Sequence, residues 1–283
     1  MNVLKNFHPA CVFLYFFYII FISIFSFDPI ILCVGFLGVV LYCLLITEKR
    51  ALIKSLSVYF IIFLAVAVTN PLFSHNGKTV LFFINDNRVT LEAFIYGAVL
   101  GLAIVEVILW FKAFNIVFDS ERIIFLFGKI SPKLALVFSM TLRCIPRFLK
   151  SFKEINRAQK LLSGNKRIKR YLLSFSAVIT SAMENSIITS DSMKSRGYGL
   201  KKHTCYSRFK ITLSDIVFMI FSTLMFIISV VWRTGFEYYP SFIFPELGVY
   251  NVLGYTAFFI LAFTLFIIEA KEGIRWKYSI SKI

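Results

Sequence analysis

Residues 94–111 read FIYGAVLGLAIVEVILWF, eighteen residues with one charged side chain, Glu106. A helix needs about 20 predominantly apolar residues to cross the hydrocarbon core of a bilayer, so this stretch is nearly all of a membrane span. The whole chain has a similar character, because 58% of its 283 residues are hydrophobic and 16% are charged. Soluble domains carry about 25% charged residues. The stretch and its setting predict an integral membrane protein.

Five other stretches have the composition of membrane spans. They lie at residues 10–27, 30–46, 55–69, 216–232 and 249–268. The first is not followed by a small-residue cleavage site, so we expect it to be a retained span and not a signal peptide. The third stops at Asn70-Pro71, which predicts a helix end there. The sequence thus predicts an all-α, polytopic membrane protein with about six spans.

The positive charge of the chain is concentrated between the fourth and fifth predicted spans. Residues 112–215 contain 20 of the 31 lysines and arginines, and the net charge of the chain is +16. The positive-inside rule therefore places this segment and both termini in the cytoplasm of a multi-pass cell-membrane protein. We expect an N-terminal membrane domain over 1–118, a cytoplasmic region over 119–213, and C-terminal spans with a basic tail over 214–283.

The cytoplasmic region reads as two amphipathic helices joined by a basic turn, NKRIKR (165–170). The first helix is expected to start at Ser131-Pro132, a cap followed by proline at the first helical position, and to end at Gly164-Asn165. In both helices apolar residues recur every three or four positions, which is the spacing of one helix face. These are Phe138, Leu142, Ile145, Leu149, Phe152 and Ile155, and then Leu172, Phe175, Ile179, Met183 and Ile187.

The second helix is expected to stop at Gly197, within the stretch SDSMKSRGYG (190–199). Arg196 then stands at the helix end between two small residues, Ser195 and Gly197. One interpretation is a cation that stabilises its own helix dipole, ahead of an ordinary glycine cap. The other is a fork of hydrogen-bond donors suited to carboxylates or carbonyls in a groove of another protein.

Motifs of catalysis and nucleotide binding are missing from the sequence. It contains no HExxH, G-x-S-x-G or GxxxxGK[ST], so any ATP used with this protein must be bound by another chain. The five cysteines and three histidines show no ligand spacing, and we expect neither a metal site nor a cofactor. The basic region lies next to a bilayer, which favours acidic headgroups or an acidic protein surface over nucleic acid as its partner.

Two other classes of function stay open at this point. Glu106 is six residues before Lys112 and could reach the membrane interface, so a membrane-embedded enzyme could use it with polar groups near Asn70 and His75. The predicted topology puts those groups on opposite leaflets, which disfavours this alternative. A structural membrane protein with a lipid-binding basic platform is the other alternative, and such a platform would tolerate Arg196→Lys.

Three stretches together carry a resemblance to a known family. They are NPLFSHNGKTVLFFINDNRVTLEAFIYGAVLGL (70–102), SPKLALVFSMTLRCIPRFLKSFKEINRAQ (131–159) and DSMKSRGYG (191–199). In this order and topology the chain resembles the transmembrane T component of energy-coupling factor (ECF) transporters, the EcfT/CbiQ family. The resemblance implies a non-catalytic scaffold. Two cytoplasmic coupling helices would each dock in one of two ABC ATPase subunits, and the membrane helices would hold a substrate-binding S component.

The resemblance also implies two docking tips in this chain. Residues 195–197 (Ser195, Arg196 and Gly197) match the second tip. The first tip follows Ala158, Gln159 and Lys160, where the family has an arginine motif and this chain has Leu161 and Leu162. We therefore expect the first tip to dock through apolar contact, leaving more of the coupling to Arg196. The solute would be chosen by the S component, and vitamins, nickel and cobalt ions all fit.

Overall fold

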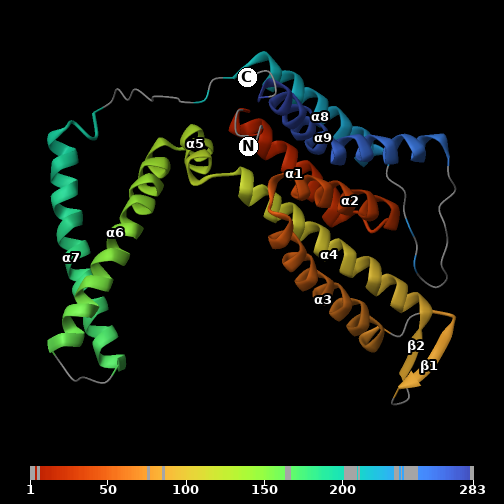
Figure 1. Ribbon diagram of the computed structural model, residues 1–283, viewed down its shortest axis with the longest axis horizontal. Coiled ribbons are helices and arrows are strands. Elements are labelled where there is room, and N and C mark those ends of the chain that lie inside the picture. Colours follow the sequence, from red (N-terminus) through yellow and green to blue (C-terminus); the bar gives the residue numbers. More distant parts are fainter. Residues whose placement is uncertain are drawn as a thin grey trace. The chain divides into compact units, whose positions relative to one another are not determined.

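The computed structural model describes most of the chain as helices (Figure 1). The described residues are 4, 7–74, 77–84, 87–162, 167–200, 209, 211–232, 236, 238 and 248–280. Their elements in chain order are α1 (Pro9–Phe25), α2 (Pro29–Ile46), α3 (Lys49–Phe73), β1 (Val80–Ile84), β2 (Asn87–Thr90), α4 (Leu91–Val117), α5 (Ser120–Ile130), α6 (Pro132–Leu162), α7 (Arg167–Ser195), α8 (Leu213–Val231) and α9 (Val249–Ile280). The all-α fold class predicted from the sequence is confirmed, with one short hairpin added.

The chain forms two compact units. One, which we call the membrane unit, consists of Met1–Asp119 and Phe209–Ile283, and the other, which we call the central unit, is Ser120–Arg208. In the membrane unit α4 contacts α1, α2 and α3, while α9 contacts α2 and α8. The largest fully buried side chains of this unit include Trp110, Tyr15, Tyr42 and Phe16, so helices from across the sequence share one core.

Six of the described helices are long and apolar enough to cross a membrane, namely α2, α3, α4, α7, α8 and α9. Five of these match predicted spans. The remaining predicted span is α1, a shorter apolar helix of 17 residues whose neighbours include α4 and α8. The sixth long helix, α7, was predicted as an amphipathic helix and is the least apolar of the six. By length and composition α7 is thus also a candidate span, although its mean hydropathy of 1.2 is well below the 2.1–2.7 of the other five.

The predicted end of the third span at Asn70-Pro71 is wrong, because α3 continues to Phe73 with Pro71 inside it. Proline removes only its own N–H from the helix ladder. The last turn is still closed, because the Ser74 N–H donates to the Asn70 carbonyl at 2.9 Å. The Asn70 side chain also donates to the Ala93 carbonyl of α4 at 2.8 Å. Tertiary contact thus stabilises a turn that local rules would end.

Two glycines of α4 allow α3 to approach closely. A Cβ built on Gly97 would lie 2.9 Å from the Asn70 Cβ, and one on Gly101 would lie 3.0 Å from the Phe63 carbonyl oxygen. This spacing of small residues, four apart on one helix face, is typical of tightly packed membrane helices. The pair α3–α4 is accordingly among the most extensive contacts of the membrane unit.

Gly101→Leu is therefore expected to destabilise the membrane unit by about 1–3 kcal/mol, the usual cost of overpacking. The neighbouring atom is backbone of α3, so the helices must move apart. Unfolding in mild detergent with increasing denaturing detergent, followed by circular dichroism, measures the effect. Gly273→Leu is the matched control, because a Cβ at Gly273 would meet nothing within 4 Å. Equal stability of the two variants would show that Gly101 is not needed for close packing.

The central unit contains a pair of long helices, α6 and α7, which cross each other in Figure 1. Arg170 Nε donates to Asn156 Oδ1 at 3.2 Å, and the rings of Phe152 and Tyr171 stack with centroids 6.3 Å apart. Ser174, one turn further along α7, is fully buried. The contacts therefore lie near the turn that joins the two helices, as predicted for a hairpin or crossed pair.

Candidate functional site

The C-terminal end of α7 is closed by glycine in the left-handed conformation. The Gly197 N–H donates to the Lys194 carbonyl at 2.9 Å, and the Tyr198 N–H donates to the Met193 carbonyl at 3.0 Å. This pair of bonds is the Schellman motif, and Gly197 has the positive φ of 85° that the motif requires. Arg196 is then the C-cap residue, and its side chain is presented at the helix tip.

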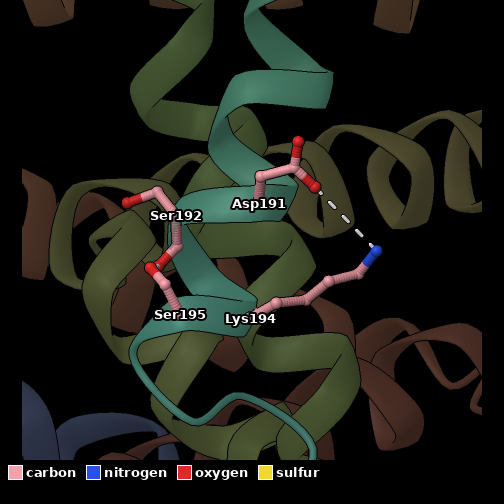
Figure 2. A network of polar contacts seen from close by, with 4 residues as sticks. All are labelled: Asp191, Ser192, Lys194 and Ser195. Carbon is pink, nitrogen blue, oxygen red and sulfur yellow. Dashed lines mark hydrogen bonds and ion pairs between the residues drawn. The ribbon is translucent and has the colours of Figure 1, made fainter.

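The side chains of Lys194 and Ser195, just before Arg196, form contacts within the last turns of α7, as Figure 2 shows. Lys194 Nζ lies 3.9 Å from Asp191 Oδ1, and Ser195 Oγ donates to the Ser192 carbonyl at 2.9 Å. Arg196 itself is exposed and forms no ion pair within the part of the chain that the structure describes. Its five N–H donors are free for an external acceptor, whereas Lys194 shares its charge with a carboxylate one turn away.

The first predicted tip lies at the C-terminal end of α6. Ala158 and Lys160 are exposed, and Leu161 is 88% exposed. Gln159 is half-buried. The side chain of Leu162 and all of residues 163–166 lie outside the described residues. The structure thus places one exposed apolar side chain, that of Leu161, at the C-terminal end of α6.

The two tips belong to two different helices. The first lies in the last turns of α6, and the second closes the last turn of α7. Helix α7 has 29 residues, which at 1.5 Å per residue gives it a length of about 43 Å. The structure therefore does not bring the predicted site residues into one cluster but places them at the C-terminal ends of two helices.

Most of the apolar stripes of α6 and α7 lies outside the contact between the two helices, although Phe152 of the α6 stripe stacks on Tyr171. Leu149 is 57% exposed and Met183 is 67% exposed, although both were assigned to the apolar faces. The buried positions of α7 are Ser174 and Val178, on a neighbouring face. Within the described part of the central unit, the stripes are thus left for a lipid or protein surface outside it.

Glu106 is enclosed within the membrane unit. Its side chain is fully buried, and Ser23 Oγ of α1 donates to its Oε1 at 2.7 Å. Gly35 of α2 leaves the space for the carboxyl group, because a Cβ there would lie 2.0 Å from Oε1. Helices α1, α2 and α4 therefore pack around this carboxyl group, which fits a structural role.

The polar groups of the hypothetical enzyme do not share a site. Asn70 bonds to Ala93, which is 13 residues before Glu106 on α4, a distance of about 20 Å along the helix axis. His75 lies outside the described residues. Asn70 and Glu106 therefore serve two separate packing junctions.

Residues 70–102, the first of the three stretches that carry the family resemblance, form a junction at one end of the α3–α4 pair. β1 and β2 form an antiparallel hairpin there, with Ile84 paired to Asn87. The Glu92 carboxylate accepts N–H bonds from Lys78 at 3.3 Å and Thr79 at 3.2 Å, and Thr90 Oγ1 caps the N-terminus of α4. Sequence reasoning did not assign a role to Glu92, although a carboxylate in the first turn of a helix is favoured by the helix dipole.

Comparison with protein families gives one finding. The model of the family described as CbiQ, cobalt transport protein, matches residues 2–207, which is well over half of the chain. The match covers α1 to α4, the hairpin and the central unit with both predicted tips. A search of curated proteins found no match.

Proposed function

The chain belongs to the CbiQ family of cobalt transport proteins, and from this membership we propose that it is the energy-coupling transmembrane subunit of an ECF-type ABC importer. In this role it would link ATP hydrolysis by two partner ATPase subunits to reorientation of a substrate-binding S component. The coarser statement, a multi-pass membrane component of a transport system, follows directly from the family and the long apolar helices.

The observation that carries the proposal is a pair of exposed helix ends. Leu161 lies at the C-terminal end of α6 and Arg196 at the C-terminal end of α7, and both side chains are exposed. Two separate ATPase subunits can each bind one of these ends. A change in the distance between the subunits would then move the packed pair α6–α7, because packed helices move as rigid elements.

The two tips are proposed to dock in different ways. Arg196 offers a planar fork of donors, which suits carboxylates and carbonyls in a groove. Leu161 and Leu162 would enter an apolar pocket of the other subunit, with Lys160 at its edge. Ser195 and Gly197 are small enough to let the arginine enter, and Ala158 and Gln159 would line the first contact. The proposal of one apolar and one arginine docking contact is wrong if Leu162→Asp and Arg196→Glu both leave the complex intact.

The role of this chain is proposed to be non-catalytic. Its buried carboxylate, Glu106, is enclosed by Ser23 and Gly35 and supports packing instead of chemistry. ATP would be bound and hydrolysed in the partner chains. We also propose the predicted division into 1–118, 119–213 and 214–283, with the middle part and both termini in the cytoplasm, because 20 of 31 basic residues fall between α4 and α8.

The exposed apolar faces of α6 and α7 support a further partner in or at the membrane. Leucine and phenylalanine side chains that are half exposed on two long helices would aggregate in water. The S component is the surface that we propose to cover them. The transported solute would be a vitamin or a transition-metal ion, and the family description favours cobalt.

Co-purification tests this proposal. The tagged chain is expressed with its genomic neighbours, extracted in mild detergent, and its partners are identified by mass spectrometry. Two ATPase subunits and a small hydrophobic protein are the expected partners. ATP hydrolysis should appear only in the assembled complex. Hydrolysis by the isolated chain, or isolation of the chain alone with turnover of a lipid or peptide, would contradict the proposal.

A further inference from the structure

An apolar cavity of about 380 Å³ lies on the side of the membrane unit, between α2, α3 and α4. The cavity is lined by Phe36, Leu56, Tyr59, Phe60, Phe63, Leu102 and Val105. Phe60 is 62% exposed, so the cavity opens sideways where lipid surrounds these helices, while Val105 at 4% exposure belongs to its floor. A cavity of this composition suits a hydrocarbon chain.

A lysine stands at one end of this cavity. Lys112 Nζ of α4 donates to Ser55 Oγ of α3 at 2.8 Å, and it lies 5.8 Å from the ring centroid of Tyr59. Tyr59 lines the cavity, and Ser55 precedes Leu56, which also lines it. The ammonium group is therefore held at the cavity mouth by two side chains from the helix that forms the cavity wall.

Lys112 has no anionic partner in the described part of the chain, because it forms no ion pair there. The start of α3 carries three exposed cations, Lys49, Arg50 and Lys54, and one exposed carboxylate, Glu48. A lysine ammonium carries three donors, of which Ser55 takes one. Lys112 beside an open apolar cavity thus forms a site that a negative group with a long apolar tail would complete.

We propose that this cavity binds an anionic phospholipid, with its phosphate at Lys112 and one acyl chain between Phe36, Tyr59 and Leu102. Charge complementarity carries the assignment, because a free phosphate would leave the cavity empty and a neutral hydrophobe would leave Lys112 without an anionic partner. Basic pockets between membrane helices are suited to anionic headgroups of the cytoplasmic leaflet. The site does not depend on the proposed transport role, since it lies wholly within the membrane unit.

Native mass spectrometry of the full-length chain tests the headgroup. The protein is delipidated and incubated with equal amounts of dioleoyl phosphatidylglycerol and dioleoyl phosphatidylcholine. Wild-type protein should retain the anionic lipid about fivefold more than the zwitterionic lipid, the factor that one lysine beside the membrane surface provides. Lys112→Gln should bring the ratio close to one. Lys78→Gln removes the same charge at the opposite end of the α3–α4 pair and should leave the ratio unchanged.

A second variant tests the cavity itself. Leu102→Phe adds volume inside it and should lower retention of both lipids, without lowering the thermal stability of the protein in detergent. A photo-cross-linking side chain at Phe60 then reports the occupant in native membranes. Cross-links to phospholipid support the proposal. Equal retention of the two lipids by wild type, an unchanged ratio in Lys112→Gln, or cross-links only to a membrane protein would each overturn it.

Discussion

Arg196→Glu is expected to remove at least one ATPase subunit from the detergent-solubilised complex and to abolish ATP-dependent uptake. The substitution reverses the charge at a helix tip that has no ion pair of its own in the described structure, so the folded chain loses only the interaction of a cation with the helix dipole, about 0.3–1 kcal/mol. A charged anchor in a protein groove is commonly worth at least 2 kcal/mol, which corresponds to about a thirtyfold loss of affinity. Pull-down with quantified ATPase stoichiometry measures the effect.

Two matched variants make the result specific. Lys194→Glu introduces the same charge change one residue before Ser195, outside the proposed docking residues 195–197. It should keep both ATPases bound, although it replaces the exposed Lys194–Asp191 ion pair with two like charges. Arg196→Lys keeps the charge but loses the planar fork, so it should weaken docking to an intermediate extent. A basic platform for lipids would instead treat arginine and lysine alike. Retention of both ATPases by Arg196→Glu would contradict the proposed docking tip.

The helices could be predicted from the sequence because each span is a local property. Eighteen apolar residues in a row, as in 94–111, define a span without knowledge of any other part of the chain. The helix end at Gly197 was equally local, since only the backbone of glycine adopts the left-handed conformation at little cost. Helix α7 was harder to classify as a span or a cytoplasmic helix, because its length and apolar content are sufficient for a membrane span.

Features that depend on tertiary contact could not be predicted. The rule that proline ends a helix failed at Pro71, because Asn70 is bonded to α4. The spacing of apolar residues identified the apolar faces of α6 and α7. It did not identify the face of α7 that is buried against α6, where Ser174 and Val178 lie. An interpretation from this spacing assumes that the core lies within the same chain. The hairpin β1–β2 was missed because its first strand reads as one more apolar run.

The site was predictable only as two separate motifs. Arg196 and the leucines of the first tip could be named from the sequence, but their placement at the ends of two helices needed the bounds of α6 and α7. The surroundings of Glu106 could not be predicted, because Ser23 and Gly35, which enclose it, are distant from it in sequence.

Gly35→Ala is expected to destabilise the membrane unit strongly, although it adds a single methyl group. The new Cβ would lie 2.0 Å from Glu106 Oε1 and 2.8 Å from its Cδ, and the side chain of Phe258 is 3.3 Å away. Glu106 is fully buried, so its carboxyl group has no solvent to move into. Relief of the clash would break its bond to Ser23. Overpacking of about 1–3 kcal/mol is then joined by the cost of a lost buried hydrogen bond, also about 1–3 kcal/mol.

A double-mutant cycle decides whether Glu106 is the origin of that cost. Glu106→Ala alone should also destabilise the protein, because it leaves a cavity and an unpaired Ser23 hydroxyl. In that background, however, Gly35→Ala should cost almost nothing, since its methyl group would occupy the vacated space. Glu106→Gln is the control, because the amide keeps the shape of the carboxyl group and should leave Gly35→Ala as costly as before. Unfolding free energies of all six proteins in detergent give the coupling, and direct neighbours usually couple by about 0.5–3 kcal/mol. The same cost of Gly35→Ala in all three backgrounds would mean that something other than Glu106 fills the space beside Gly35, and the three-helix junction would have to be redrawn around Phe258.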